Sequence, residues 1–540
     1  MMARPPSSRS VRSGVALVAV LAALCLSACR SPQGARRSAD RQAYRIISEK
    51  SPAVPGMTPS FSLELPQDAP SAAKVAGAAR SGTLAPLSLA DAAVTAAASS
   101  RDFQRQKEGL YLKALDLTYQ RYLFSAHFSG VLSGMFEATS SDRSVEGGAT
   151  FGISKALSTG ADLGLTLSGN FLRFLSGDPR QSAEGILRFT LTQPLARGAG
   201  KRVAQENLTQ AERDVLYELR SFVRYRRQFL VSVASDYFRV LQQKDIVANE
   251  RMNLENLTSA RQRAQMLFEA GRLPGIQVAQ AEQDELRARN RWISAQQAYQ
   301  SSLNEFKITL GLPPDTPLEL DAAELSRLSA QGLEEVSLTL QKALDVALAR
   351  RLDLANAADQ ARDAERKVTV AENSLKSDID LSLSADLGTD RAANRYGGGI
   401  QVDLPLDRLS ERNQYRRSLI EVDRARRAYE LLRDRVVQQI DGGWRSLEEA
   451  RVTYEIQLRS VELAQQRVEN TALLIEAGRA QMRDLLEAQE ALVGARNALT
   501  AALVNHRVAM LELWRDMEVL TFQNQAFTQE PLDNESSEES

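Results

Sequence analysis

The sequence contains very little cysteine and histidine. Its 540 residues include two cysteines, Cys25 and Cys29, both close to the N-terminus, and only two histidines. Thiolate and imidazole are the usual ligands of zinc and of other soft metals, so we expect no metal centre of that kind. We also expect no disulfide, because no cysteine follows residue 29.

A surplus of charge of either sign is also lacking. Lys and Arg together number 67, and Asp and Glu together number 68. This balance gives no electrostatic reason to expect nucleic acid as a partner. The sequence offers no Ser/His/Asp or Cys/His set, and it has no phosphate-loop spacing. We therefore expect a protein that is not an enzyme and that uses no cofactor.

The longest apolar run lies at the N-terminus. The stretch "GVALVAVLAALCLSAC", residues 14–29, follows a segment with three arginines. It is too short to span a bilayer comfortably and is typical of a signal peptide. Its last four residues, "LSAC", resemble the bacterial lipobox. That resemblance implies cleavage after residue 28, a lipid on Cys29 and, because Arg30 follows, passage to the outer membrane. An ordinary signal peptide with a chance cysteine is the alternative.

The flanking segments have the composition of disordered chain. Residues 29–85 are rich in Ser, Pro, Ala and Gly without periodicity, which predicts a flexible, lipid-anchored tether. Residues 522–540 predict an acidic, disordered tail. No other run reaches about 18 apolar residues, so we expect no transmembrane helix.

The region between the flanks is a tandem duplication. Residues 87–103 match 338–354 at an offset of 251, and 191–202 match 402–413 at an offset of 211. The stretch "FEAGRLPGIQVAQAEQDELRARN" (268–290) matches "IEAGRAQMRDLLEAQEALVGARN" at an offset of 207. The order is the same in both halves. The first half has about 40 extra residues before Pro194.

Each half predicts a short helix, a β region, a long helix and a second short helix. Apolar periodicity and the positions of Gly and Pro set the boundaries. The first repeat (86–311) has helix 89–122, β region 123–194, long helix 201–268 and helix 276–310. A linker covers 312–337. The second repeat (338–521) has helix 338–375, β region 378–405, long helix 410–475, which the Gly442-Gly443 pair could kink, and helix 481–520.

The β regions alternate apolar and polar residues. In "SDIDLSLSADL" (377–387), Ile379, Leu381 and Leu383 face one way and the Asp and Ser residues face the other. Such strands suit either a sheet on a soluble core or a lipid-facing barrel. Strands of about 9–10 residues are long enough to cross a bilayer when tilted. The extra residues of the first half are either additional barrel strands or an extracellular hairpin, and we favour the hairpin.

The duplicated order resembles the TolC family of outer-membrane efflux proteins, over residues 87–520. The matching blocks are "LSLADA" with "LTLQKA", "LTQPLARGAGKR" with its strand-to-helix proline, and the two "AGR" segments. The resemblance implies a mainly α fold with a membrane β-barrel portion, in which long antiparallel helices form a trimeric α-barrel. Each chain would add strands to a shared 12-stranded barrel, because a sheet in lipid must close and too few strands are present in one chain.

The resemblance also assigns functional positions. It places the AGR turns at the far periplasmic end, where they would meet a periplasmic adaptor of an inner-membrane pump. These residues are Ala270, Gly271, Arg272, Leu273, Ala477, Gly478, Arg479 and Ala480. Asp484 and Glu487 would form a ring of carboxylates at the closed tip, and Arg272, Arg479 and Arg483 could lock it through ion pairs. Plain helix caps and solvated surface acids are the alternatives.

The resemblance therefore implies a passive exit duct of a tripartite efflux or type I secretion system. Its partners would be two further copies of the chain, the adaptor, the pump and outer-membrane lipid. Most of the chain would lie in the periplasm, anchored by the lipid on Cys29. A lipid-anchored periplasmic coiled-coil scaffold without channel activity is the alternative from another class.

Overall fold

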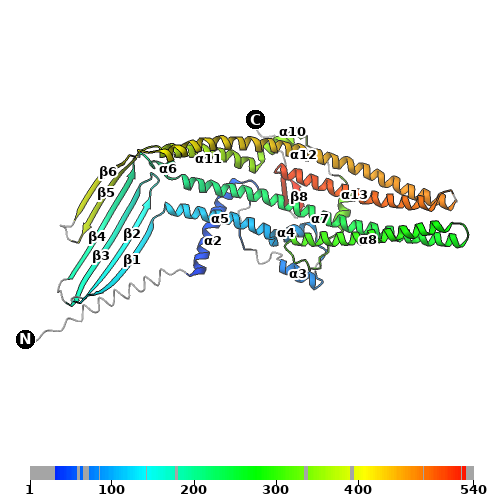
Figure 1. Ribbon diagram of the computed structural model, residues 1–540, viewed down its shortest axis with the longest axis horizontal. Coiled ribbons are helices and arrows are strands. Elements are labelled where there is room, and N and C mark those ends of the chain that lie inside the picture. Colours follow the sequence, from blue (N-terminus) through cyan, green and yellow to red (C-terminus); the bar gives the residue numbers. More distant parts are fainter. Residues whose placement is uncertain are drawn as a thin grey trace, which may run out of the picture.

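The computed structural model is an elongated rod with a β-sheet at one end and two helical hairpins at the other (Figure 1). The structure describes residues 31–57, 61–64, 72–83, 85–140, 143–176, 181–333, 338–389, 394–404, 406–477, 479–523 and 526–530. The predicted signal peptide, Cys29, Gly478 and the end of the predicted tail lie outside these residues.

The helices repeat the offsets of the sequence. In the first half they are α4 (Leu89–Ser99), α5 (Arg101–Leu123), α6 (Lys201–Ala204), α7 (Glu206–Glu269) and α8 (Gly275–Thr309). In the second half they are α10 (Leu340–Arg350), α11 (Leu352–Ser374), α12 (Leu409–Glu476) and α13 (Met482–Asp516). Helices α10 and α11 follow α4 and α5 by 251 residues, and α13 follows α8 by 207. The duplication in sequence is therefore a duplication in structure.

The first helix of each half is divided, whereas the sequence predicts one continuous helix. The break falls at Ser100 and at Arg351, both of which have extended backbone, with φ/ψ of −64°/129° and −63°/119°. Both residues are almost fully buried. Neither is Gly or Pro, so tertiary packing rather than local propensity sets the break. Conversely, the Gly442-Gly443 pair lies inside the continuous helix α12.

The sheet has six antiparallel strands in the order β1-β2-β3-β4-β5-β6. They are β1 (His127–Ala138), β2 (Arg143–Ala156), β3 (Asp162–Ser176), β4 (Gln181–Pro194), β5 (Asp378–Gly388) and β6 (Arg395–Asp403). By the sequence offsets, β5 is the counterpart of β1 and β6 is the counterpart of β4. The extra residues of the first half supply β2 and β3.

The preference for an extracellular hairpin is therefore wrong, and so is the expectation of four strands per chain that underlies a 12-stranded barrel. The extra residues are hydrogen-bonded into the sheet on both sides: β2 pairs with β1, and β3 pairs with β4. The pattern of alternation in the sequence could not decide this, because a protruding hairpin and an inserted pair of strands have the same alternation.

One face of the sheet is apolar across all six strands. Residues that pair directly lie on the same face, and one such row is Phe151, Leu167, Leu187 and Leu387. These side chains are well exposed, with Leu167 at 53%. The opposite face carries polar side chains. On it, Arg188 of β4 donates to Asp386 of β5 with an Nε–Oδ1 distance of 2.8 Å.

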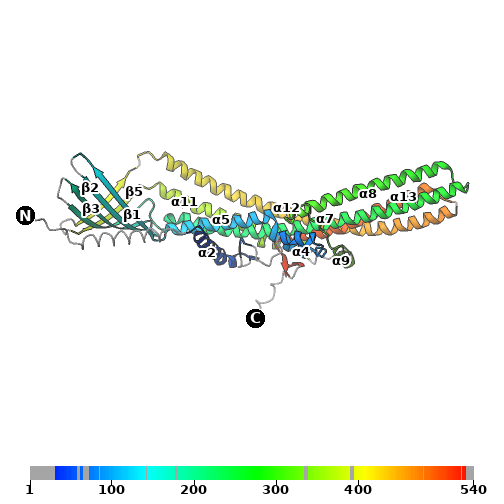
Figure 2. The ribbon, with the colours of Figure 1, turned by 90° about the horizontal axis from the view of Figure 1, so that it is seen from below.

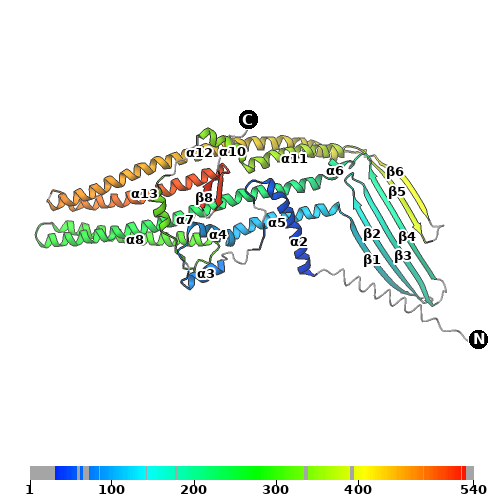
Figure 3. The same cartoon turned by 180° about the vertical axis from the view of Figure 1, so that it is seen from behind.

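The predicted tether contains ordered structure. Helix α2 (Pro32–Lys50), the 3-10 turn η1 (Ser51–Ala53) and helix α3 (Ala72–Arg80) lie within it. Helix α2 packs beside α5 (Figures 1 and 3), buries Ala43, Ile46 and Ile47, and receives a 2.6 Å hydrogen bond from Tyr111 to Asp40. These apolar residues have helical spacing, but the surrounding Arg and Ser residues obscure it.

Two other segments differ from the expectation of irregular chain. The predicted linker 312–337 contains α9 (Ala323–Gln331), and the predicted tail begins with the hairpin β7 (Leu520–Gln523) and β8 (Ala526–Gln529). Both lie around the middle of the rod (Figure 2). Phe527 of the hairpin is buried in a cluster with Trp514 and Met517. Burial of this aromatic ring explains why the acidic tail is ordered at its start.

Ile47 is the largest fully buried side chain of helix α2. We predict that Ile47→Ala loosens α2 from α5, because truncating a buried Ile to Ala costs about 2–5 kcal/mol. Trypsin should then cleave at Arg41 and Arg45 faster than in the unchanged protein. Gln42→Ala is the matched control, because Gln42 is exposed on the same helix. Equal cleavage rates for both variants would contradict a docked α2.

Candidate functional site: the hairpin tips and the groove between the repeats

The two hairpin tips have the same capping geometry. After α7, Arg272 N donates to Leu267 O at 2.8 Å and Gly271 N to Phe268 O at 2.9 Å. This pair of bonds is the Schellman motif, which requires a left-handed residue, and Gly271 has φ of +70°. After α12, Arg479 N donates to Leu474 O at 2.8 Å, again 207 residues later. The repeated segment therefore encodes the same reversal twice.

The tips expose most of the residues that the resemblance assigns to docking. Ala270, Gly271, Arg272, Ala477 and Arg479 are exposed. Leu273 and Ala480 are half-buried, and Gly478 lies outside the described residues.

An apolar cluster joins the two hairpins near their tips. It contains Leu257 of α7, Ala281 of α8, and Met482 and Leu485 of α13. Leu273 packs against the edge of this cluster. The two tips are thus held side by side, although they are 207 residues apart in the sequence.

The predicted gate residues lie at the start of α13. Asp484 accepts from the backbone N of Gln481 at 3.0 Å and completes a capping box. Glu487 lies 3.6 Å from Arg483 of its own helix, and both side chains are more than half exposed. The structure therefore places the pair on one helix face, as the spacing predicts. Within the described part of the chain, Arg272 and Arg479 have no ion-pair partner.

A link between the hairpins was not predicted. Arg291 of α8 donates to Glu490 of α13 at 2.6 Å, and its Nε lies 3.7 Å from Glu250 of α7. Arg291 and Glu490, together with Arg287 and Glu487, line a cavity of about 250 Å³ between α8 and α13. The sequence contains no signal for this link, because Arg291 and Glu490 are 199 positions apart and the chain has many other charged residues that could pair.

A row of arginines on α7 faces acids of the second repeat. Arg220 Nη1 lies 2.7 Å from Asp359 Oδ2, and Arg213 Nη2 lies 3.1 Å from Asp359 Oδ1. Arg224 pairs with Asp353 at 3.4 Å. In the other direction, Arg366 of α11 pairs with Glu206 of α7 at 2.7 Å. Charge pairs therefore hold the two repeats together along the seam between α7 and α11.

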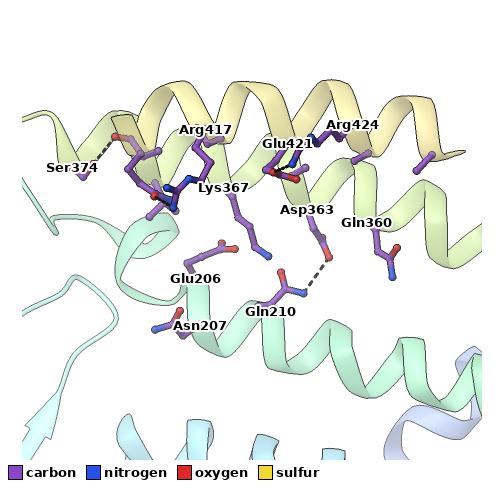
Figure 4. A pocket seen from close by; sticks show the side chains of 17 residues that line it. Glu206, Asn207, Gln210, Gln360, Asp363, Lys367, Ser374, Arg417, Glu421 and Arg424 are labelled. Carbon is purple, nitrogen blue, oxygen red and sulfur yellow. Dashed lines mark hydrogen bonds and ion pairs between the residues drawn. The ribbon is translucent and has the colours of Figure 1, made fainter. Parts of the chain in front are cut away.

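The seam opens on one side into a groove lined by α7, α11 and α12, close to the sheet (Figure 4). Its cavity has a volume of about 750 Å³. Polar and charged side chains such as Gln210, Asp363, Lys367, Arg417 and Glu421 line it, together with Ala and Val side chains and the aliphatic parts of the longer residues. The groove mixes both signs of charge, which suits a hydrated surface rather than a site for one ion.

Two half-buried acids of the seam, Asp359 and Asp353, remain ionised. Burial by itself raises the pKa of Asp359, but the hydrogen bond from Arg220 and the charge of Arg213 bring the pKa below its ordinary value. Asp353 is similar. Burial by itself raises its pKa, but the hydrogen bond from Arg351 and the charge of Arg224 outweigh burial and bring the pKa below its ordinary value. Both carboxylates therefore stabilise the fold in their charged form.

The described residues contain neither a candidate membrane-spanning helix nor a candidate metal-binding cluster. None of the helices there has the length and apolarity needed to cross a bilayer. None of the His, Cys, Asp and Glu side chains in those ranges gather into a group of three or more that could hold a metal ion.

Asp359 provides a test of the seam. A carboxylate whose folded pKa is lowered stabilises the fold above its unfolded pKa of about 3.9, and this stabilisation is lost as the pH falls through the folded value. We expect Asp359→Asn to cost about 1.5–3 kcal/mol at pH 7, the value of hydrogen bonds to charged groups. The difference from the unchanged protein should shrink towards pH 3. Urea unfolding followed by circular dichroism in detergent measures it.

The matched control is Glu365→Gln on the same helix. Glu365 pairs with Arg426 at 2.7 Å, but both side chains are about half exposed. Exposed pairs contribute about 0–1 kcal/mol. A loss for Asp359→Asn that is no larger than this control, or that does not depend on pH, would remove the seam from the explanation.

No model of a known protein family matches the chain. Individual proteins of similar sequence or similar structure are known, and they are outer-membrane proteins. Outer membrane efflux protein BepC of Brucella suis biovar 1 (strain 1330) is 24% identical over 325 residues, which cover 59% of this chain and 68% of that protein. The CmeC outer membrane channel of Campylobacter jejuni has a TM-score of 0.60 at 12% identity, covering 79% of this chain and 85% of that chain. The outer membrane protein VceC of Vibrio cholerae has a TM-score of 0.59 at 15% identity, covering 79% and 95%.

The solved structures show that the fold is that of outer-membrane channels: long antiparallel helices joined to antiparallel strands. The efflux relative is similar in sequence as well. In this fold, and in the duplicated blocks at offsets of 251, 211 and 207, the chain is similar to outer-membrane efflux proteins of the TolC family.

Proposed function

We propose that this protein is the passive exit duct of a tripartite efflux or type I secretion system. Three copies join their sheets into one barrel in the outer membrane, and their helices form a tunnel through the periplasm. Transport energy comes from an inner-membrane pump, since the sequence has no phosphate-loop motif. The cargo passes through the hydrated interior and needs no enzymatic step.

The observation that carries the proposal is the two-faced sheet. One face exposes apolar side chains on every strand, such as Phe128 at 78% and Ile400 at 66%. The opposite face is polar and includes the Arg188–Asp386 pair. Lipid suits the first face and water suits the second, as in a membrane barrel around an aqueous channel. Open sheet edges are not tolerated in lipid, so several copies are needed for closure.

The far end of the rod suits contact with an adaptor. Each chain has two tips with the same capped reversal, and a trimer therefore presents six. The tips carry Arg272 and Arg479, which are exposed. We propose that these residues and their neighbours meet a periplasmic adaptor protein.

The lipid anchor, if Cys29 carries it, is held close to the rod. Helix α2 starts at Pro32, and Ser31 caps it by accepting from Gly34 N at 3.1 Å. Only two residues of the sequence, Arg30 and Ser31, lie between Cys29 and the start of this helix, which packs on α5. We therefore propose that the lipid enters the membrane beside the helical layer and not at the end of a long tether.

The function is tested with the full-length purified protein. The duct predicts an oligomer of three copies that resists carbonate extraction from membranes and forms single channels in planar bilayers. A monomer that carbonate releases and that never conducts would support the periplasmic scaffold instead and would overturn the duct.

The carboxylates at the tip should influence the channel. We predict that Asp484→Asn combined with Glu487→Gln reduces block by added multivalent cations and lowers cation selectivity, because the ring loses its negative charge. The Asn side chain keeps an acceptor for the capping bond to Gln481. Gln277→Ala with Gln280→Ala, at the equivalent positions of the first repeat, is the control. Unchanged single-channel currents in the charge-neutral variant would exclude a role of the ring.

A further inference from the structure

Both edges of the described sheet are open. Within it, β1 pairs only with β2, and β6 pairs only with β5. Natural edge strands usually carry Lys or Pro, or are very short, to prevent pairing with another chain. Strand β1 has 12 residues and β6 has 9, and neither contains Lys or Pro. Both edges are therefore suited to pair with further strands.

The two edges fit each other in direction. Neighbouring strands alternate in direction, so β1 runs away from the helices and β6, the sixth strand, runs back towards them. Placed side by side, β6 of one copy and β1 of the next are antiparallel, like each pair within the sheet. The first residue of β1 follows α5 closely and the last residue of β6 precedes α12, so both strands meet the helices at the same end (Figure 1).

The register shows how strongly the strands are inclined. A row of directly paired residues starts at His127, passes Ser154, Gly164, Thr190 and Ser384, and ends at Gly397. Gly397 lies six residues before Asp403, where β6 ends at the helices. Six residues over five strand spacings correspond to a tilt of about 40° for a rise of about 3.3 Å and a spacing of about 4.8 Å. Closed membrane barrels have this tilt.

The sheet and the helical layer below it have matching widths. At a tilt of about 40°, each strand occupies about 6.3 Å of circumference, so six strands occupy about 38 Å. The helices next to the sheet are α5, α11, α12 and the short α6, which α7 continues (Figure 1). Four packed helices at about 8–10 Å each occupy about 32–40 Å. The six strands and the four helices of one chain thus occupy about the same length of circumference. Four strands at this tilt would occupy only about 25 Å.

We propose that β1 of each copy pairs with β6 of the next and that three copies close an 18-stranded barrel. The inference rests on the proposed function for the number of copies. What it adds is the number of strands in the barrel, the pairing of β1 with β6 between copies, and the diameter of the barrel. At the same tilt, 18 strands give a backbone diameter of about 36 Å, compared with about 24 Å for 12 strands. The membrane section is then about as wide as the tunnel beneath it.

The joint has a restricted register. Polar residues of β1 must lie beside polar residues of β6, so only even shifts are allowed. A shift of two residues, which continues the stagger of the sheet, places Ser133 opposite Gly399. A shift of zero places Val131 opposite Gly399 instead. No described atom lies within 4 Å of the position that a Cβ on Gly399 would take. The bulky side chains of β1, such as Met135, have room beside this glycine-rich strand.

Spin labels on single cysteines test the strand number in the full-length oligomer in liposomes. Phe151→Cys and Thr150→Cys probe the two faces of β2, and Leu383→Cys and Ser384→Cys are the matched references on β5. The natural Cys29 carries its lipid or is replaced by Ser. In an 18-stranded barrel, the labels at 151 and 383 collide with oxygen dissolved in lipid, and the labels at 150 and 384 collide with a water-soluble nickel complex.

The outcomes separate this inference from the proposed function. If β5 alternates but both β2 labels meet the nickel complex, β2 lies outside the membrane and the 18-stranded barrel is overturned, while the duct stands. If β5 does not alternate either, the membrane barrel itself fails, and the proposed function fails with it.

Cross-linking tests the joint. Ser133→Cys with Gly399→Cys, and Val131→Cys with Gly399→Cys, cover the two allowed registers. Treatment with a short bifunctional maleimide should convert one of these variants into dimers and trimers on denaturing gels. The three single-cysteine variants are the controls and should remain monomeric. A conducting trimer in which neither pair cross-links would contradict contact between β1 and β6.

Discussion

The demand of backbone N–H and C=O groups for hydrogen-bond partners is the constraint on which this structure depends. In lipid no water can satisfy the edges of a sheet, so the apolar face that β1 to β6 present makes sense only in a closed ring. The chain has strands for only part of such a ring. In the proposed duct, the membrane section is therefore completed by further copies of the chain, and the same closure brings together the helices that continue the strands.

The seam between the repeats answers a related problem inside one chain. Helices α7 and α11 derive from different halves, and their contact is rich in charge: Arg213 and Arg220 meet Asp359, and Arg366 meets Glu206. Apolar packing is concentrated elsewhere, around Phe222 and Tyr237 where α7 meets α5 and α8, and near the tips around Leu257. A wall with water on one side cannot bury wide apolar faces on both, so directional ion pairs fix its register.

Much of this architecture can be predicted from the sequence, because a repeat places its own boundaries. The offsets 251 and 207 fix α10, α11 and α13 once α4, α5 and α8 are recognised. The AGR segments predict capped reversals because glycine is needed at a left-handed position. What could not be predicted depends on tertiary contacts. Ser100 and Arg351 break helices through burial, α2 is ordered by docking on α5, and Arg291 finds Glu490 across hairpins that share no local signal. Alternation predicts strands but not which of them become neighbours.

The insertion of β2 and β3 has a consequence for how such ducts diverge. The pair β2–β3 starts and ends at the far end of the sheet and turns at the helical end, so β4 still enters α6 and α7 on the same side as β1 leaves α5. The periplasmic stalk therefore does not need to be rebuilt when the pair is gained or lost. Evolution can change the calibre of the membrane pore in units of one hairpin per subunit, independently of the machinery that the stalk engages.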